Sequence, residues 1–184
     1  MTNAISKMFA VLIALALLYI YPAAEAAKRQ DELAQLVVYN AVTQFVDAVR
    51  MKGYITPVMY QDLLDEMNLT GNSYEVTLEH QHKKYHPNYL DAANPGTFQN
   101  SFDVYFLGTH HEMIMAKLFP DNSLPKDNPA RRYQMMVGDF VKVKVKSTNR
   151  TAALVLSDFI TGSNSADRVA VAFSYGGMVI NEDY

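Results

Sequence analysis

The segment from Met8 to Ala24 constrains this chain more than any other, because about 17 consecutive residues carry no charge and approach the length that crosses a bilayer as a helix. The polar run Glu25 to Glu32 follows at once. The sequence therefore predicts a short tail at 1–7, a membrane anchor or signal segment at 8–24 and an extracytoplasmic domain at 25–184. The side chains expected to meet lipid are Phe9, Leu12, Leu15, Leu18, Tyr21 and Pro22.

Two interpretations of this segment remain open. Lys7 before the apolar run, Pro22 near its end and the small residues of Ala24-Glu25-Ala26 are typical of a cleaved signal peptide. The helical pattern that continues beyond the run instead favours a retained anchor. The first interpretation predicts a secreted protein, and the second predicts a single-pass membrane protein whose C-terminal domain lies outside the cytoplasm.

After the anchor, apolar residues recur at intervals of three, four and one, which is the pattern of an amphipathic helix. We expect this helix to extend from Ala23 to Met51, to bend at Pro22 because proline lacks a backbone donor, and to end near Gly53. Its apolar face should pack on a sheet, and we expect this helix to be the one used for assembly. That face is predicted to hold Leu33, Leu36, Val37, Ala41, Phe45, Ala48 and Val49.

Further helices are indicated by their first residues. Thr56 and Pro57 combine a capping side chain with a proline suited to a first helical turn, so a helix should follow them. Thr109 and Glu112 have the spacing of a capping box at the start of another helix. A third helix is expected over 151–160.

Strands are predicted where apolar and polar residues alternate. They are expected at 74–82, around 102–106, at 140–146 and from Val169 to Tyr175, with an exposed loop at 83–99. In the third strand Val141, Val143 and Val145 should face inward and Lys142, Lys144 and Lys146 outward into solvent. The short connections favour an antiparallel sheet, and so an α+β fold.

The composition excludes several functional classes. The net charge of −3 provides no basic surface for nucleic acid. The absence of cysteine excludes a disulfide framework and thiolate metal sites. No phosphate-binding loop, nucleophile elbow or His-Glu-x-x-His motif is present, so we expect no enzymatic activity and no cofactor.

The histidines are the weak candidates for a metal site. His80 and His82 would point the same way from one strand, and His86 would reach the same ion only if the chain turned back. The strand is expected to end in solvent nearby, and no Cys, Asp or Glu stands at ligand spacing. The sequence therefore favours ordinary polar positions for these imidazoles.

Three stretches resemble a known group of proteins: Tyr39 to Arg50 (YNAVTQFVDAVR), Gly53 to Pro57 followed by Met59-Tyr60, and Tyr175 to Val179 (YGGMV). They are similar to uncharacterised proteins of Gram-positive tight-adherence (Tad) pilus loci. The layout of tail, apolar helix, continuing amphipathic helix and α/β head likewise resembles pilins and TadE-like minor pilins. The resemblance implies a pilin-like head on a membrane-held protein exposed outside the cell.

Type IV prepilins usually carry a leader that ends in glycine and an acidic residue early in the mature helix. Here no glycine precedes Gly53 and the apolar run contains no glutamate. These differences favour an initiating, tip or accessory role over that of a major subunit. The expected partners are the membrane and other pilin-like or secretion-platform proteins. The alternative is a secreted or anchored extracytoplasmic domain that binds a ligand or a metal.

Overall fold

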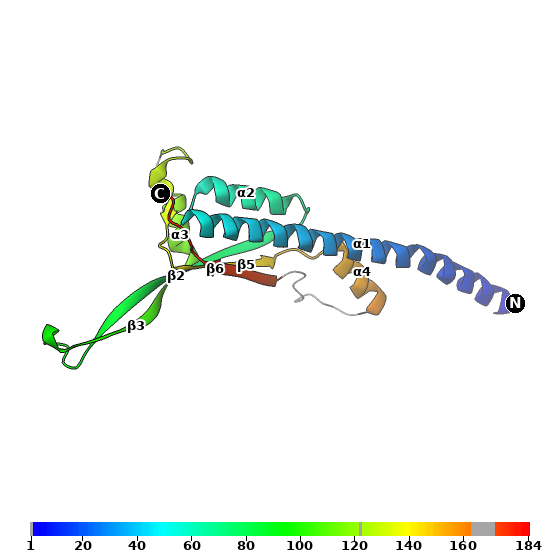
Figure 1. The fold of residues 1–184 in the computed structure, drawn as a ribbon. Helices are drawn as coiled ribbons and strands as arrows, with labels where there is room; N and C mark the ends of the chain where they lie inside the picture. Colours follow the sequence, from blue (N-terminus) through cyan, green and yellow to red (C-terminus); the bar gives the residue numbers. More distant parts are fainter. Residues whose placement is uncertain (1, 122, 163–171) are drawn as a thin grey trace.

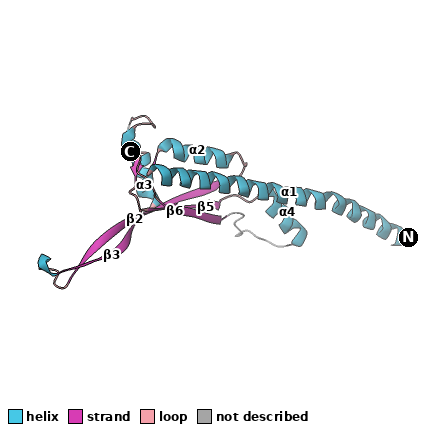
Figure 2. Cartoon of the chain, viewed as in Figure 1, coloured by secondary structure: helices cyan, strands magenta, loops and turns pink. Residues whose placement is uncertain are grey.

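The computed structural model describes residues 2–121, 123–162 and 172–184, and its fold is α+β, as the sequence predicts (Figure 1). The long helix α1 (Thr2–Lys52) projects alone at its N-terminal end and lies along the sheet at its C-terminal end. Figure 2 shows the helices and strands that surround it. They are β1 (Tyr54–Ile55), α2 (Pro57–Asn68), β2 (Tyr74–Tyr89), β3 (Phe98–Thr109), α3 (His111–Leu118), β4 (Tyr133–Gln134), β5 (Phe140–Ser147), α4 (Ala152–Thr161) and β6 (Ala172–Met178), with 3-10 turns at Pro95–Thr97 and Pro129–Arg131.

The helix α1 passes through Pro22 without a break, so the helix expected from Ala23 is continuous with the apolar segment before it. A proline removes one backbone hydrogen bond, and the turns on both sides continue the helix past it. The predicted C-terminal end of α1 near Gly53 is confirmed. Gly53 adopts a left-handed φ of 74° and its amide donates to the carbonyl of Val49 at 2.8 Å.

The buried face of α1 differs from the predicted one around residues 33–38. Phe45 and Val49 are buried as expected, but Leu33 and Val37 are 64% and 39% exposed, so their predicted packing on the sheet is wrong. Apolar side chains surround the helix on several sides near residue 35, and periodicity alone cannot select one of them. The buried stripe consists of Ala34, Val38, Ala41, Val42, Phe45, Val46 and Val49.

The larger sheet is antiparallel, with strand order β3-β2-β5-β6. The first half of β2 pairs with β5, from Tyr74 opposite Ser147 to Gln81 opposite Phe140. Its second half pairs with β3 alone, and the two strands project beyond the sheet as a hairpin (Figure 1). The loop expected at 83–99 is therefore too long, because 83–89 belong to β2 and 98–99 to β3, and only 90–97 connect the two strands. Because β2 has a free edge beyond β5, the missing amide of Pro87 is tolerated there.

The core lies between α1 and one face of the sheet. Val141, Val143 and Val145 are buried in it, as predicted, while Lys144 on the opposite face is exposed and pairs with Glu79. The helix α2 packs on α1. The sheet is thus covered by helices on one side and solvated on the other.

Of the two predicted helix caps, one is present and one is not. The hydroxyl of Thr56 accepts the amide of Met59 at 3.1 Å, and Thr151 caps α4 in the same way. The capping box at Thr109 is wrong, because that residue pairs with His80 in the sheet. His110 takes the capping position of α3 instead, with no side-chain hydrogen bond.

The last strand extends beyond its predicted end at Tyr175 and includes a glycine pair. Val169 and Val171 lie outside the described residues, whereas Phe173 and Tyr175 belong to β6 as predicted. Gly176 and Gly177 are also in β6. A Cβ on the first would lie 2.6 Å from the carbonyl oxygen of Val141, so the strand needs glycine there. A Cβ on the second would lie 2.5 Å from Nε of Arg50, so the Arg50 side chain would have to move.

Candidate functional site

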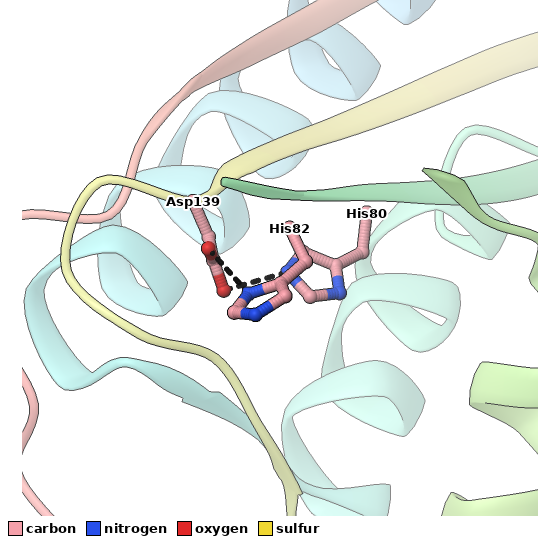
Figure 3. Close-up of side chains that lie close together, drawn as sticks. All are labelled: His80, His82 and Asp139. Carbon is pink, nitrogen blue, oxygen red and sulfur yellow. Dashed lines mark hydrogen bonds and ion pairs between the residues drawn. The ribbon is translucent and has the colours of Figure 1, made fainter. Parts of the chain in front are cut away.

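Three side chains converge where the hairpin leaves the sheet: His80, His82 and Asp139, here called the Asp139 cluster (Figure 3). The two histidines share one face of β2, as the alternation predicted. Asp139 immediately precedes β5 and follows a turn at Gly138, whose φ is 92°. The antiparallel pairing of Gln81 with Phe140 brings these distant parts of the chain together.

The carboxylate of Asp139 is held by four hydrogen bonds. His80 Nε2 lies 2.9 Å from Oδ2 and His82 Nδ1 lies 2.8 Å from Oδ1. The backbone amide of Lys83 donates to Oδ1 at 2.9 Å, and that of Met136 donates to Oδ2 at 2.8 Å. Each oxygen therefore faces one imidazole and one backbone amide, which fixes the orientation of the carboxylate.

The second nitrogen of His80 is also occupied. Its Nδ1 lies 2.7 Å from the hydroxyl oxygen of Tyr133, and that hydroxyl makes a further side-chain hydrogen bond with Thr109. Tyr133 is placed by the short pairing of β4 with β1. The outcome is a continuous chain of hydrogen bonds from Thr109 to Asp139.

Burial determines the charge of His80, and hydrogen bonds determine that of Asp139. His80 is 5% exposed and Asp139 is 1% exposed. Burial lowers the pKa of His80 below its ordinary 6.5, although Asp139 acts in the opposite direction, so the imidazole is neutral at pH 7. Burial raises the pKa of Asp139, but hydrogen bonds from Lys83, Met136 and the two histidines outweigh it, and the net shift is downward from 3.8. The cluster therefore combines a neutral His80 with an ionised Asp139.

This geometry corrects the expected surroundings of the histidines. His80 does not lie at a solvated strand end, and both imidazoles have a carboxylate partner 57 to 59 residues away. One nitrogen from each histidine and an oxygen of Asp139 all lie within 4.8 Å of one another, so the three could hold a metal ion. His86 is not part of the cluster, since β2 continues straight and sets it opposite Asp103.

His110 and His111 lie outside the Asp139 cluster. His111 accepts the amide of Leu78 through Nδ1 at 3.2 Å, and His110 begins α3. Sequence reasoning missed Asp139 and Tyr133. Only the position of Asp139 directly before the strongest predicted strand offered a signal, and that signal required knowing which strand is its neighbour.

Two exposed apolar surfaces lie at opposite ends of the molecule. At one end, α1 is the one helix in the described part of the chain that is long and apolar enough to cross a membrane, and the predicted lipid-facing residues are exposed along it. This helix could equally be a signal sequence. At the other end, one face of the β2–β3 hairpin is aromatic and apolar. This hairpin face consists of Tyr85, Pro87, Tyr89, Phe98, Phe102, Val104 and Phe106.

Comparison with known proteins identifies no relative: no family model matches the chain, and neither the curated proteins nor the solved structures contain a significant match.

Proposed function

We propose that this chain is a non-enzymatic, membrane-anchored, pilin-like accessory protein of a Tad or type IV pilus-like or secretion assembly. The observation that carries the proposal is the division of α1 (Figure 1). Its apolar N-terminal window is wholly unburied by the rest of the chain, whereas its C-terminal half supplies the core of the head. A helix that is apolar and uncovered in one half needs lipid or other apolar helices around it.

The two ends of the molecule separate the anchor from the hairpin face. The anchor and the hairpin face lie at opposite ends of the long axis, so a membrane around residues 8–24 leaves the hairpin remote from the lipid (Figure 1). The helix α4 lies beside α1 just beyond the anchor. Tyr21 and Glu25 of α1 line a groove together with Leu154 and Ile160 of α4. The hairpin face is then available to a protein partner.

An exposed patch of α1 supports contact with neighbouring subunits. Leu33, Leu36 and Val37 are 64%, 56% and 39% exposed, and they lie directly after the polar run that separates the anchor from the head. In an assembly of pilin-like proteins this patch would pack against another helix. Large exposed apolar surfaces of this kind are typical of interaction sites.

The test combines membrane fractionation with site-specific photocrosslinking in the native cells. Full-length protein should stay in the membrane after carbonate washing, because apolar burial rather than charge holds it there. A photoreactive residue at Leu33 or Phe102 should yield adducts with pilin-like or platform proteins, while one at Leu69, which is 85% exposed on a turn, should not. Soluble full-length protein, or the same adducts from all three positions, would contradict the proposal.

A second candidate function, a secreted or anchored metal-binding domain, is favoured by the Asp139 cluster alone.

A further inference from the structure

We infer that the Asp139 cluster binds one divalent transition-metal ion of the zinc class, through His80 Nε2, His82 Nδ1 and the carboxylate of Asp139. The inference does not depend on the proposed membrane or pilus role. It follows from the donor atoms, from the groups that hold those donors, and from the position of the cluster in the fold.

The donor set suits this class of metal. Imidazole nitrogen is a favoured ligand of zinc and related ions, and two histidines with one carboxylate leave a fourth position for solvent. The three ligand atoms lie within 4.8 Å of one another, and tetrahedral zinc sets its ligands about 3.3 Å apart. Small rotations of the two imidazoles toward a shared ion would close that difference (Figure 3).

The groups around the donors already support ligation. Metal-binding histidines usually donate from their other ring nitrogen to a fixed acceptor. With the metal on Nε2 of His80, the ring proton moves to Nδ1 and is donated to the hydroxyl oxygen of Tyr133, 2.7 Å away. That hydroxyl can donate onward to Thr109. The amides of Lys83 and Met136 continue to orient the carboxylate of Asp139.

The second imidazole gives the ion a route to the site. The side chain of His82 is 29% exposed, whereas that of Asp139 is 2% exposed. When Nδ1 of His82 ligates the metal, its proton moves to Nε2 on the same ring. Both imidazoles therefore change tautomer without releasing a proton, and the ion replaces two hydrogen bonds with two coordinate bonds.

The position of the cluster indicates what the ion would do. His80 and His82 belong to β2, and Asp139 belongs to the turn before β5. An ion bound by all three would fasten the base of the hairpin to the sheet. Metal should therefore slow backbone hydrogen exchange in the hairpin as well as raise the unfolding temperature.

The experiment uses the full-length protein in detergent with a tag that contains no histidine. After removal of metal with a chelator, Zn²⁺ is added in competition with a chromophoric chelator, and bound zinc is measured by elemental analysis. We expect one zinc per chain, a higher unfolding temperature and slower exchange at 83–106. Co²⁺ should give the visible absorption of a site with nitrogen ligands.

Two variants and a matched control decide the outcome. His82→Gln should weaken zinc affinity about tenfold or more, and it should fold because the Gln amide can still donate to Asp139. Asp139→Asn should also lose zinc. His86→Gln on the same strand should bind zinc normally, since His86 lies opposite Asp103 in the hairpin. Sub-stoichiometric zinc in the wild type, or equal losses in His82→Gln and His86→Gln, would overturn the inference.

Discussion

The backbone amide of Lys83 donates to Oδ1 of Asp139 at 2.9 Å, two residues beyond the last pair between β2 and β5 at Gln81 and Phe140. A side chain thus continues the hydrogen bonding of the sheet where the neighbouring strand has ended. The backbone of Asp139 meanwhile accepts the amide of Val179 at 2.8 Å. Asp139 therefore joins three parts of the chain at the base of the hairpin.

Replacing Asp139 should destabilise the protein even without metal. In Asp139→Asn the new NH₂ group would face donors, and at least one buried donor would lose its acceptor, at a cost of about 2 to 4 kcal/mol. Urea unfolding in detergent and excess chelator measures the change. Asp103→Asn, at an exposed position on the hairpin, is the control and should cost less than about 0.5 kcal/mol. Similar losses in the two variants would mean that the four hydrogen bonds are unimportant for stability.

The two faces of β5 should respond differently to the same substitution. Val143 is fully buried, so Val143→Asn would remove apolar burial and leave an amide without partners, at a cost of about 3 to 5 kcal/mol. Lys144→Asn would lose only the exposed pair with Glu79, worth at most about 1 kcal/mol. Thermal unfolding by circular dichroism compares them. Equal unfolding temperatures would show that the strand faces have been assigned wrongly.

On α1, one substitution should lower stability and another should weaken assembly without lowering stability. Phe45→Ala creates a cavity under a residue that is 6% exposed and should cost about 3 to 5 kcal/mol. Leu33→Ala should leave the free energy of unfolding within about 0.5 kcal/mol, because Leu33 is mostly exposed. If the proposed function holds, Leu33→Ala should still reduce crosslinking to partner subunits. Crosslinking at the wild-type level in that variant would show that Leu33 is not part of the contact with partner subunits.

Gly71 and Gly53 have nearly the same φ, so substituting each by alanine separates the cost of backbone strain from the cost of a steric clash. Gly71 has a φ of 75° and open space around it, so Gly71→Ala should cost about 1 to 2 kcal/mol for the left-handed conformation alone. Gly53 has a φ of 74°, but a Cβ there would lie 2.5 Å from the backbone oxygen of Asn181. Gly53→Ala should therefore cost clearly more in urea unfolding. Equal costs would indicate that the C-terminal segment moves away freely.

Tryptophan fluorescence can show which end of the head lies at the membrane, because the chain contains no tryptophan of its own. Phe159 on α4 is 73% exposed near the anchor, and Phe102 on the hairpin is 56% exposed at the far end. In vesicles, Phe159→Trp should be quenched by brominated lipid, whereas Phe102→Trp should not. The physical reason is that aromatic side chains beside a spanning helix lie at the lipid interface. Quenching of Phe102→Trp alone would place the hairpin, and not α4, at the membrane.

Local sequence patterns predicted the elements whose determinants are local. The side chain of Thr56 and the ring of Pro57 start α2, and Gly53 ends α1, because caps depend on a few adjacent residues. Alternation in β5 likewise placed its valines inward. The hairpin was missed, because prolines and polar residues resemble a loop until the pairing of β2 with β3 supplies their hydrogen bonds.

By itself, the sequence determined the uncharged apolar segment, the helix that continues from it, the α+β class and the shared face of His80 and His82. Those features depend on composition and on residues close together in the chain. The tertiary structure decided which side of α1 is buried, because only the position of the sheet distinguishes Val38 from Val37. It also decided that Asp139 meets the two histidines. That contact depends on the pairing of β2 with β5, two strands separated by some fifty residues, and no local pattern contains it.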